Sequence, residues 1–173
     1  MISITAVAWA GCSNNMPLLP RPGKSSRVRI RVSDPNLGSV ERTFKLHLPA
    51  GYSTSNDMPT PLVLDFHGWG GSGTSQGYRG GFDDVADEQD ANGGFIVVHP
   101  DGYGDPSARR PRNWGSWNCS RTDGPLGPPC KLPRPRGHAI HCYESCGQCS
   151  PTHSCDWTAC YDDVTFIRKE LAK

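Results

Sequence analysis

The residues with the clearest potential for chemistry lie in one glycine-rich stretch, DFHGWGGSGTSQG, at positions 65–77. Its second half contains a formal G-x-S-x-G centred on Ser75, the pattern of a nucleophile elbow in serine hydrolases. An elbow requires the serine at a sharp turn between a strand and a helix. The expected strand ends near Phe66, and several glycines separate it from the serine. We therefore interpret Ser75 as a loop serine and not as a nucleophile.

The run HGWGG at positions 67–71 fits a different task. Glycines lack the Cβ atoms that block a close approach, so such a loop can turn backbone N–H groups towards a developing oxyanion. A loop of this kind after an early strand forms half of the oxyanion hole in α/β-hydrolases. The alternative interpretation is an ordinary glycine-rich loop that binds nothing.

The strands that must position this loop follow from the apolar pattern. Residues 27–49 alternate apolar and charged side chains on both sides of a DPNLG turn, which predicts an antiparallel hairpin. Residues 61–66 (PLVLDF) and 93–102 (GGFIVVHPDG) are nearly continuous in apolar residues. They predict two strands that are covered on both faces, and we expect the first to be central in the sheet.

Two helices are predicted around these strands. Residues 82–91 place a helix between the two buried strands, which makes a right-handed parallel crossover the expected topology. Its buried stripe is expected to contain Phe82, Val85, Ala86 and Gln89. Residues 161–173 predict a second helix with Val164, Ile167 and Leu171 on one face. No later segment would cover that face, so we expect the natural polypeptide to continue beyond Lys173.

Six segments, in this order, resemble a known group of proteins: LHLPAGY, PLVLDFHGWGGSG, VADE, GFIVVHPDG, WNC and CYDDVTFI. Together they resemble the secreted α/β-hydrolases grouped as polyhydroxybutyrate depolymerase-like and feruloyl or acetyl-xylan esterase-like, over residues 27–173. The resemblance implies an α/β fold, here a truncated α/β-hydrolase. It would consist of an N-terminal β-hairpin, a βαβ unit and a long cysteine-rich irregular insertion.

The same resemblance implies roles for the glycine-rich loop. The backbone N–H of Trp69 would belong to the oxyanion hole, Gly68 and Gly70 would shape the turn, and His67 would orient the loop. In the family, the nucleophile elbow follows the helix that begins CYDDV, and the acid and base come later. The triad is therefore expected beyond Lys173, and this chain alone is expected to be inactive. No catalytic role is given to Asp65, His99 or Asp101.

Cysteines are concentrated in the irregular segment 103–160, with three interleaved histidines between His138 and His153. A C-x-x-C pair with nearby Cys and His could hold tetrahedral zinc. The Pro-, Gly- and Ser-rich surroundings and the lack of a second regularly spaced pair favour disulfides in an oxidising compartment, so no metal is assigned. The disulfide candidates are Cys119, Cys130, Cys142, Cys146, Cys149, Cys155 and Cys160.

Four aromatic residues of the segment 103–160 could form a wall of a substrate cleft, because this insertion follows a strand at the carboxyl edge of the sheet. The alternative is that they only pack an irregular loop. They are Trp114, Trp117, Tyr143 and Trp157.

Charge and the N-terminus limit the function classes. Eighteen basic and seventeen acidic residues leave a net charge of +1, so nothing indicates nucleic acid as a partner. No apolar run approaches the ~18 residues that span a bilayer.

Residues 1–26 are interpreted as an N-terminal tail or a clipped signal region, and 27–173 as the N-terminal portion of a hydrolase domain. A secreted, extracellular location is expected.

The resemblance thus implies a carboxylic-ester hydrolase that uses a serine nucleophile and no cofactor. Its substrate would be a polyester or an ester of a plant or algal polysaccharide. The alternative is a non-catalytic cysteine-rich module that binds zinc or carbohydrate.

Overall fold

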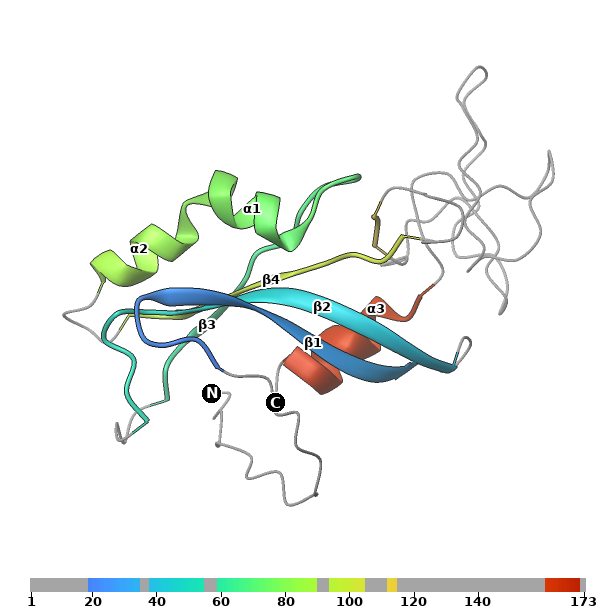
Figure 1. Cartoon of the computed structure of the whole chain (residues 1–173), viewed down its shortest axis with the longest axis horizontal. Helices are drawn as coiled ribbons and strands as arrows, with labels where there is room; N and C mark the ends of the chain where they lie inside the picture. The colour runs from blue at the N-terminus through green and yellow to red at the C-terminus, as the bar shows by residue number, and fades with distance from the viewer. Residues whose placement is uncertain are drawn as a thin grey trace.

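The computed structural model of the chain describes residues 19–34, 38–54, 59–89, 94–104, 112–114 and 161–171. These residues form a mixed four-stranded sheet in the order β1-β2-β4-β3, with helices on both faces (Figure 1). The broad α/β character expected from the sequence is confirmed. Along the helices of this described part, no segment is long and apolar enough to cross a bilayer.

The first two strands form the predicted hairpin. β1 (Lys24–Asp34) pairs antiparallel with β2 (Gly38–Leu48) along the full length of both strands. Val28 and Val32 of β1 are buried, while the arginines between and beside them are exposed, as the alternation predicts. The hairpin predicted over 27–49 is therefore confirmed, and it begins three residues earlier.

The two remaining strands form the predicted parallel pair. β3 (Leu62–Leu64) pairs parallel with β4 (Ile96–Pro100), and β4 pairs antiparallel with β2. All five residues of β4 are buried, whereas those of β3 are only half-buried. The expectation that residues 61–66 are central was wrong, because β4 takes the place beside the hairpin. Within the described sheet, β3 is an edge strand.

The two faces of the sheet differ in chemistry. Even-numbered residues of β1, β2 and β4 point to an apolar core that also contains Phe166 and Ile167. Odd-numbered residues of β2 and β4 point to the opposite face, where Lys45, His47 and His99 lie beneath two helices. Figure 1 shows α1 and α2 over one face and α3 over the other. One face is therefore held mainly by apolar packing and the other mainly by polar contacts.

The apolar face is closed by the C-terminal segment. α3 (Asp163–Thr165) begins after Asp162, whose side chain accepts from the Thr165 N–H at 2.8 Å, and it continues as a π-helix over Phe166–Leu171. Phe166 and Ile167 are 1% and 7% exposed and pack against the hairpin. The even-numbered face of the hairpin thus covers Phe166 and Ile167, so their burial requires no later segment.

An arginine lies inside this apolar face. Arg42 shares the even-numbered register of Val40 and Phe44, and it is 2% exposed. Its guanidinium forms an ion pair with the buried Asp163 carboxylate and donates to the Asp101 carbonyl at 3.2 Å. The Phe166 ring lies 4.1 Å from its Cζ atom, a cation–π distance. This pair ties β2 to α3, and no pattern in the sequence indicated it.

The polar face carries a helix that the sequence analysis missed. α1 (Gly73–Gly80) begins at Ser72, whose side chain and that of Ser75 form a reciprocal capping box. Three glycines within eight residues weaken the helical signal, which is why only a loop was expected there. A Cβ atom at Gly73 would lie 2.1 Å from the His99 carbonyl oxygen, and one at Gly77 would lie 2.5 Å from Lys45 Nζ. The glycines of the formal G-x-S-x-G thus lie on the side of α1 that contacts the sheet.

We expect Gly73→Ala to lower the free energy of unfolding by about 1–3 kcal/mol, because the added methyl group would meet backbone atoms that cannot rotate away. Gly68→Ala is the matched control, since a Cβ there meets nothing within 4 Å. It should change stability by less than about 0.5 kcal/mol. Urea unfolding of both variants measures the difference. Equal stability of the two variants would show that α1 does not lie this close to β4.

The second helix on this face, α2 (Phe82–Glu88), was predicted, but its buried stripe was not. Of the four residues expected to be buried, only Ala86 is, at 0% exposed. Phe82, Val85 and Gln89 are exposed. The helix instead turns acidic residues to the sheet, because the sheet presents cations and imidazoles there.

Asp83 is the centre of that polar contact. Its carboxylate oxygens lie 2.5 Å from Lys45 Nζ and 2.8 Å from His99 Nε2. Burial by itself raises the pKa of the Asp83 carboxyl, but hydrogen bonds from His99 and Lys45 and the charge of Lys45 outweigh burial. They hold the pKa of Asp83 well below its usual range. The other His99 nitrogen, Nδ1, lies 3.0 Å from Asp65 Oδ2, so two carboxylates hold the fully buried ring.

Candidate functional site

A cavity of about 560 Å³ lies beside the glycine-rich loop. It is lined by the loop from His67 to Ser72, by Ser75, Gln76 and Arg79 of α1, and by Arg112. The loop follows the carboxyl end of β3, and Asp101 follows the carboxyl end of its parallel neighbour β4. This edge of a parallel pair is where open α/β sheets bind their ligands.

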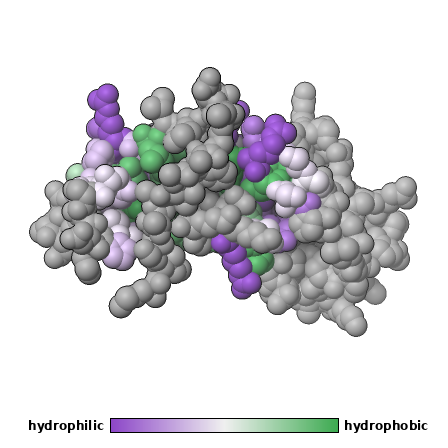
Figure 2. All heavy atoms as spheres, turned by 90° about the horizontal axis from the view of Figure 1, so that it is seen from below, coloured by the Kyte–Doolittle hydropathy of each residue, from purple (hydrophilic) through white to green (hydrophobic). Residues whose placement is uncertain are grey.

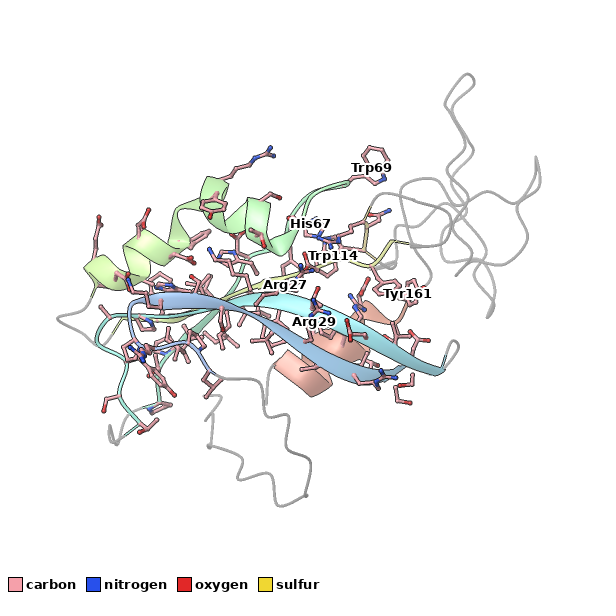
Figure 3. All side chains as sticks on the ribbon, viewed as in Figure 1. Arg27, Arg29, His67, Trp69, Trp114 and Tyr161 are labelled. Atoms are coloured by element: carbon pink, nitrogen blue, oxygen red, sulfur yellow. The ribbon has the colours of Figure 1, made fainter. Side chains whose placement is uncertain are left out.

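The loop has the geometry of a tight turn. The Gly71 N–H donates to the Gly68 carbonyl at 3.0 Å, and Gly70 between them has φ +73°. A positive φ at the third position is typical of a type II turn and favours glycine there. Trp69 is the second residue of the turn, is 40% exposed and extends away from the sheet (Figure 3). Gly70 therefore shapes the turn by its backbone conformation, and Gly68 does so by accepting the closing hydrogen bond.

Two hydrogen bonds attach His67 to its surroundings. Its side chain is buried, and Nε2 accepts from the Gly102 N–H at 2.9 Å. The other nitrogen, Nδ1, lies 2.6 Å from the Gly68 carbonyl oxygen, to which it can donate. Because Nε2 accepts, the ring is the neutral tautomer, and burial lowers its pKa accordingly. His67 thereby ties the glycine-rich loop to the residue that follows β4, which is the geometry a loop-orienting role requires.

Trp114 supports the loop from the side. Its indole N–H donates to the His67 carbonyl at 2.8 Å, and its ring lies 5.0 Å from the rings of His67 and Phe66. Figure 3 shows it close to His67. Trp114 is not among the residues that line this cavity, and its role in a substrate wall stays a prediction. The other three aromatic residues proposed for that wall, Trp117, Tyr143 and Trp157, lie outside the described residues.

The start of α1 is held by a buried carboxylate to which the sequence assigned no role. Asp101 Oδ1 accepts from the Gly73 N–H at 2.8 Å and from Arg112 Nη1 at 3.1 Å. Asp101 Oδ2 accepts from Thr43 at 2.5 Å and from Arg27 at 3.2 Å. One carboxylate therefore fixes the start of α1, the sheet and Arg112 relative to one another. The only signal for this role in the sequence was that Asp101 comes directly after a buried strand.

Ser75 lies in the cavity wall but has a structural role. Its hydroxyl donates to the Ser72 carbonyl at 2.9 Å and accepts from the Ser72 N–H at 3.0 Å. These bonds cap α1, and among the described residues no histidine contacts this hydroxyl. The interpretation of Ser75 as something other than a nucleophile agrees with this geometry.

Another serine does contact a histidine. Ser25 Oγ lies 3.0 Å from His47 Nδ1, and His47 Nε2 lies 3.0 Å from Asp87 Oδ1. Ser25 Oγ is also 3.0 Å from a carboxylate oxygen of Asp83, which competes for its proton. His47 is opposite Val97 near the start of β4, at the end away from the cavity. We assign this group to the polar contact between sheet and α2.

All seven cysteines proposed for disulfides lie outside the described residues. Within the described ranges, no group of three or more His, Cys, Asp or Glu side chains could hold a metal ion. The face seen in Figure 2 shows hydrophilic side chains projecting beside separate apolar areas.

The chain was compared with models of known protein families and with curated protein sequences, and neither comparison gave a match.

Proposed function

We propose that this chain carries the oxyanion-binding part of a carboxylic-ester hydrolase. The observation that supports this most directly is the tight turn Gly68–Gly71 beside a cavity at the carboxyl ends of β3 and β4. The backbone of such a turn is fixed before substrate binds, so the Trp69 amide would cost no reorganisation when charge develops. The buried, neutral His67 and the indole of Trp114 hold the turn in place.

In the proposed reaction, a serine hydroxyl attacks the ester carbonyl and the carbonyl oxygen becomes an oxyanion. The Trp69 amide would be one donor to that oxygen. The base would take the serine proton and pass it to the alcohol that leaves as the ester C–O bond breaks, and water would then hydrolyse the acyl-enzyme to the acid and the free serine. Each such donor typically contributes a factor of ~10²–10³ to the rate. The serine, the acid and the base would lie in sequence after Lys173, as the resemblance implies. Its substrate would be a polyester or a polysaccharide ester.

A hydrolysis assay with p-nitrophenyl acetate tests the proposal. We expect the 1–173 chain to show essentially no turnover, because a triad supplies most of the rate enhancement in such enzymes. A polypeptide extended by the coding sequence after Lys173 should be faster by at least about 10³-fold. Comparable turnover by both forms would refute the proposal. Covalent labelling of Ser75 by a fluorophosphonate in the 1–173 chain would refute it as well.

A further inference from the structure

The cavity beside the glycine-rich loop has an uneven charge. Its lining includes two arginines, Arg79 and Arg112, and no Asp or Glu among the residues that the structure describes. His67 adds no charge, because its Nε2 accepts a hydrogen bond and burial lowers its pKa. The chain as a whole has a net charge of only +1, so a wall with two guanidiniums is a local feature.

The two arginines differ in how they are held. Arg112 is attached at its backbone, where its carbonyl accepts from the Gly70 N–H at 2.9 Å, and at its side chain by Asp101. Arg27 shares the same carboxylate at 3.2 Å, so two guanidiniums face one negative charge and one positive charge remains. The bond to Asp101 uses one of the five N–H donors of Arg112, and its side chain is 40% exposed.

Arg79 faces the cavity from α1. Ser75, Gln76 and Arg79 are three and four residues apart and share one side of the helix, opposite to the glycines that touch the sheet. The Arg79 side chain is exposed, and no hydrogen bond or ion pair holds it within the described part of the chain. The start of α1 adds no positive charge to the cavity, because the Asp101 carboxylate accepts from the Gly73 N–H at 2.8 Å.

We infer that the cavity selects an ester that also carries a carboxylate, with Arg79 as the residue that recognises the charge and Arg112 as its fixed neighbour. The inference rests on the proposed function in that it takes the cavity as the substrate site. Guanidinium and carboxylate match in geometry, and a charge-assisted hydrogen bond between them is stronger than a neutral one. Two sources share this chemistry: aliphatic esters of diacids, and esters of acidic sugars.

Matched pairs of probes, which differ in one carboxylate, test the effect of charge on binding. Monomethyl adipate carries one ester and one carboxylate, and dimethyl adipate carries the same ester without the charge. O-acetyl galacturonate and its methyl ester form the corresponding sugar pair. Each probe is titrated into the ¹⁵N-labelled 1–173 chain, and the shifts of the Gly68 and Trp69 amides report binding. We expect the charged member of at least one pair to bind about tenfold more tightly, with an advantage that falls as salt is added.

Arg79→Gln should weaken binding of the preferred charged probe about fivefold and leave its uncharged partner unaffected. Arg31→Gln is the matched control, because it removes the same charge from an exposed position on β1. Equal binding of charged and uncharged probes, or equal effects of the two substitutions, would overturn the inference. Because this readout is binding and not turnover, a failed hydrolysis assay and a failed charge preference remain distinguishable. The adipate and galacturonate pairs decide between the two sources.

Discussion

Arg42→Met should lower the free energy of unfolding by about 3–5 kcal/mol, the largest stability effect that we expect from any single substitution in this chain. Arg42 and Asp163 are 2% and 1% exposed at their side chains. Removal of the guanidinium leaves the buried Asp163 carboxylate without its ion-pair partner. It also removes the hydrogen bond to the Asp101 carbonyl and the contact with the Phe166 ring.

A double-mutant cycle identifies the cause of this loss. Asp163→Asn alone should also destabilise, whereas Arg42→Met/Asp163→Asn should cost less than the sum of the two single changes. The reason is that the double variant leaves no unpaired charge buried. Arg29→Met is the control, because it breaks an exposed ion pair with Glu41 at 3.5 Å and should cost less than about 1 kcal/mol. Additive single effects, or equal losses for Arg42→Met and Arg29→Met, would contradict the buried pair.

The second large effect is expected on catalysis. In the extended, active form proposed above, Trp69→Pro should lower kcat about 10²–10³-fold, because proline has no N–H to donate to the oxyanion. The substitution suits the backbone, because Trp69 is the second residue of a turn whose third residue has φ +73°. Type II turns favour proline at the second position.

Trp69→Ala is the matched control for that experiment. It removes the same indole but keeps the amide, so kcat should change by only a few fold. Urea unfolding of both variants checks that the turn is intact. A loss of kcat in Trp69→Ala as large as in Trp69→Pro would show that the side chain, and not the amide, carries the function.

Much of the sheet could be predicted from the sequence because its pattern is local. The alternation in β1 and β2 fixes which side chains face the core, and the continuous apolar run of β4 marks a strand buried on both faces. The HGWGG run likewise determines a loop in which the structure finds a positive φ at Gly70. The interpretation of Ser75 needed only its distance from the preceding strand.

Two features of the helices depended on the tertiary structure. α1 forms despite its glycines because Gly73 and Gly77 allow it to lie against β4 and Lys45. The buried side of α2 carries Asp83 and not Phe82, because the sheet beneath it presents Lys45 and His99.

The sequence by itself determined the strands, the buried faces of β1, β2 and β4, and the glycine-rich loop, because these depend on residues close together in the chain. Only the tertiary structure decided which strand is central, which ionised groups are buried together and which side chains surround the cavity. Arg42 and Asp163 are 121 residues apart, and Arg112 reaches the turn at Gly70 from another loop. Contacts of that kind follow from packing between elements, and no periodicity within one element records them.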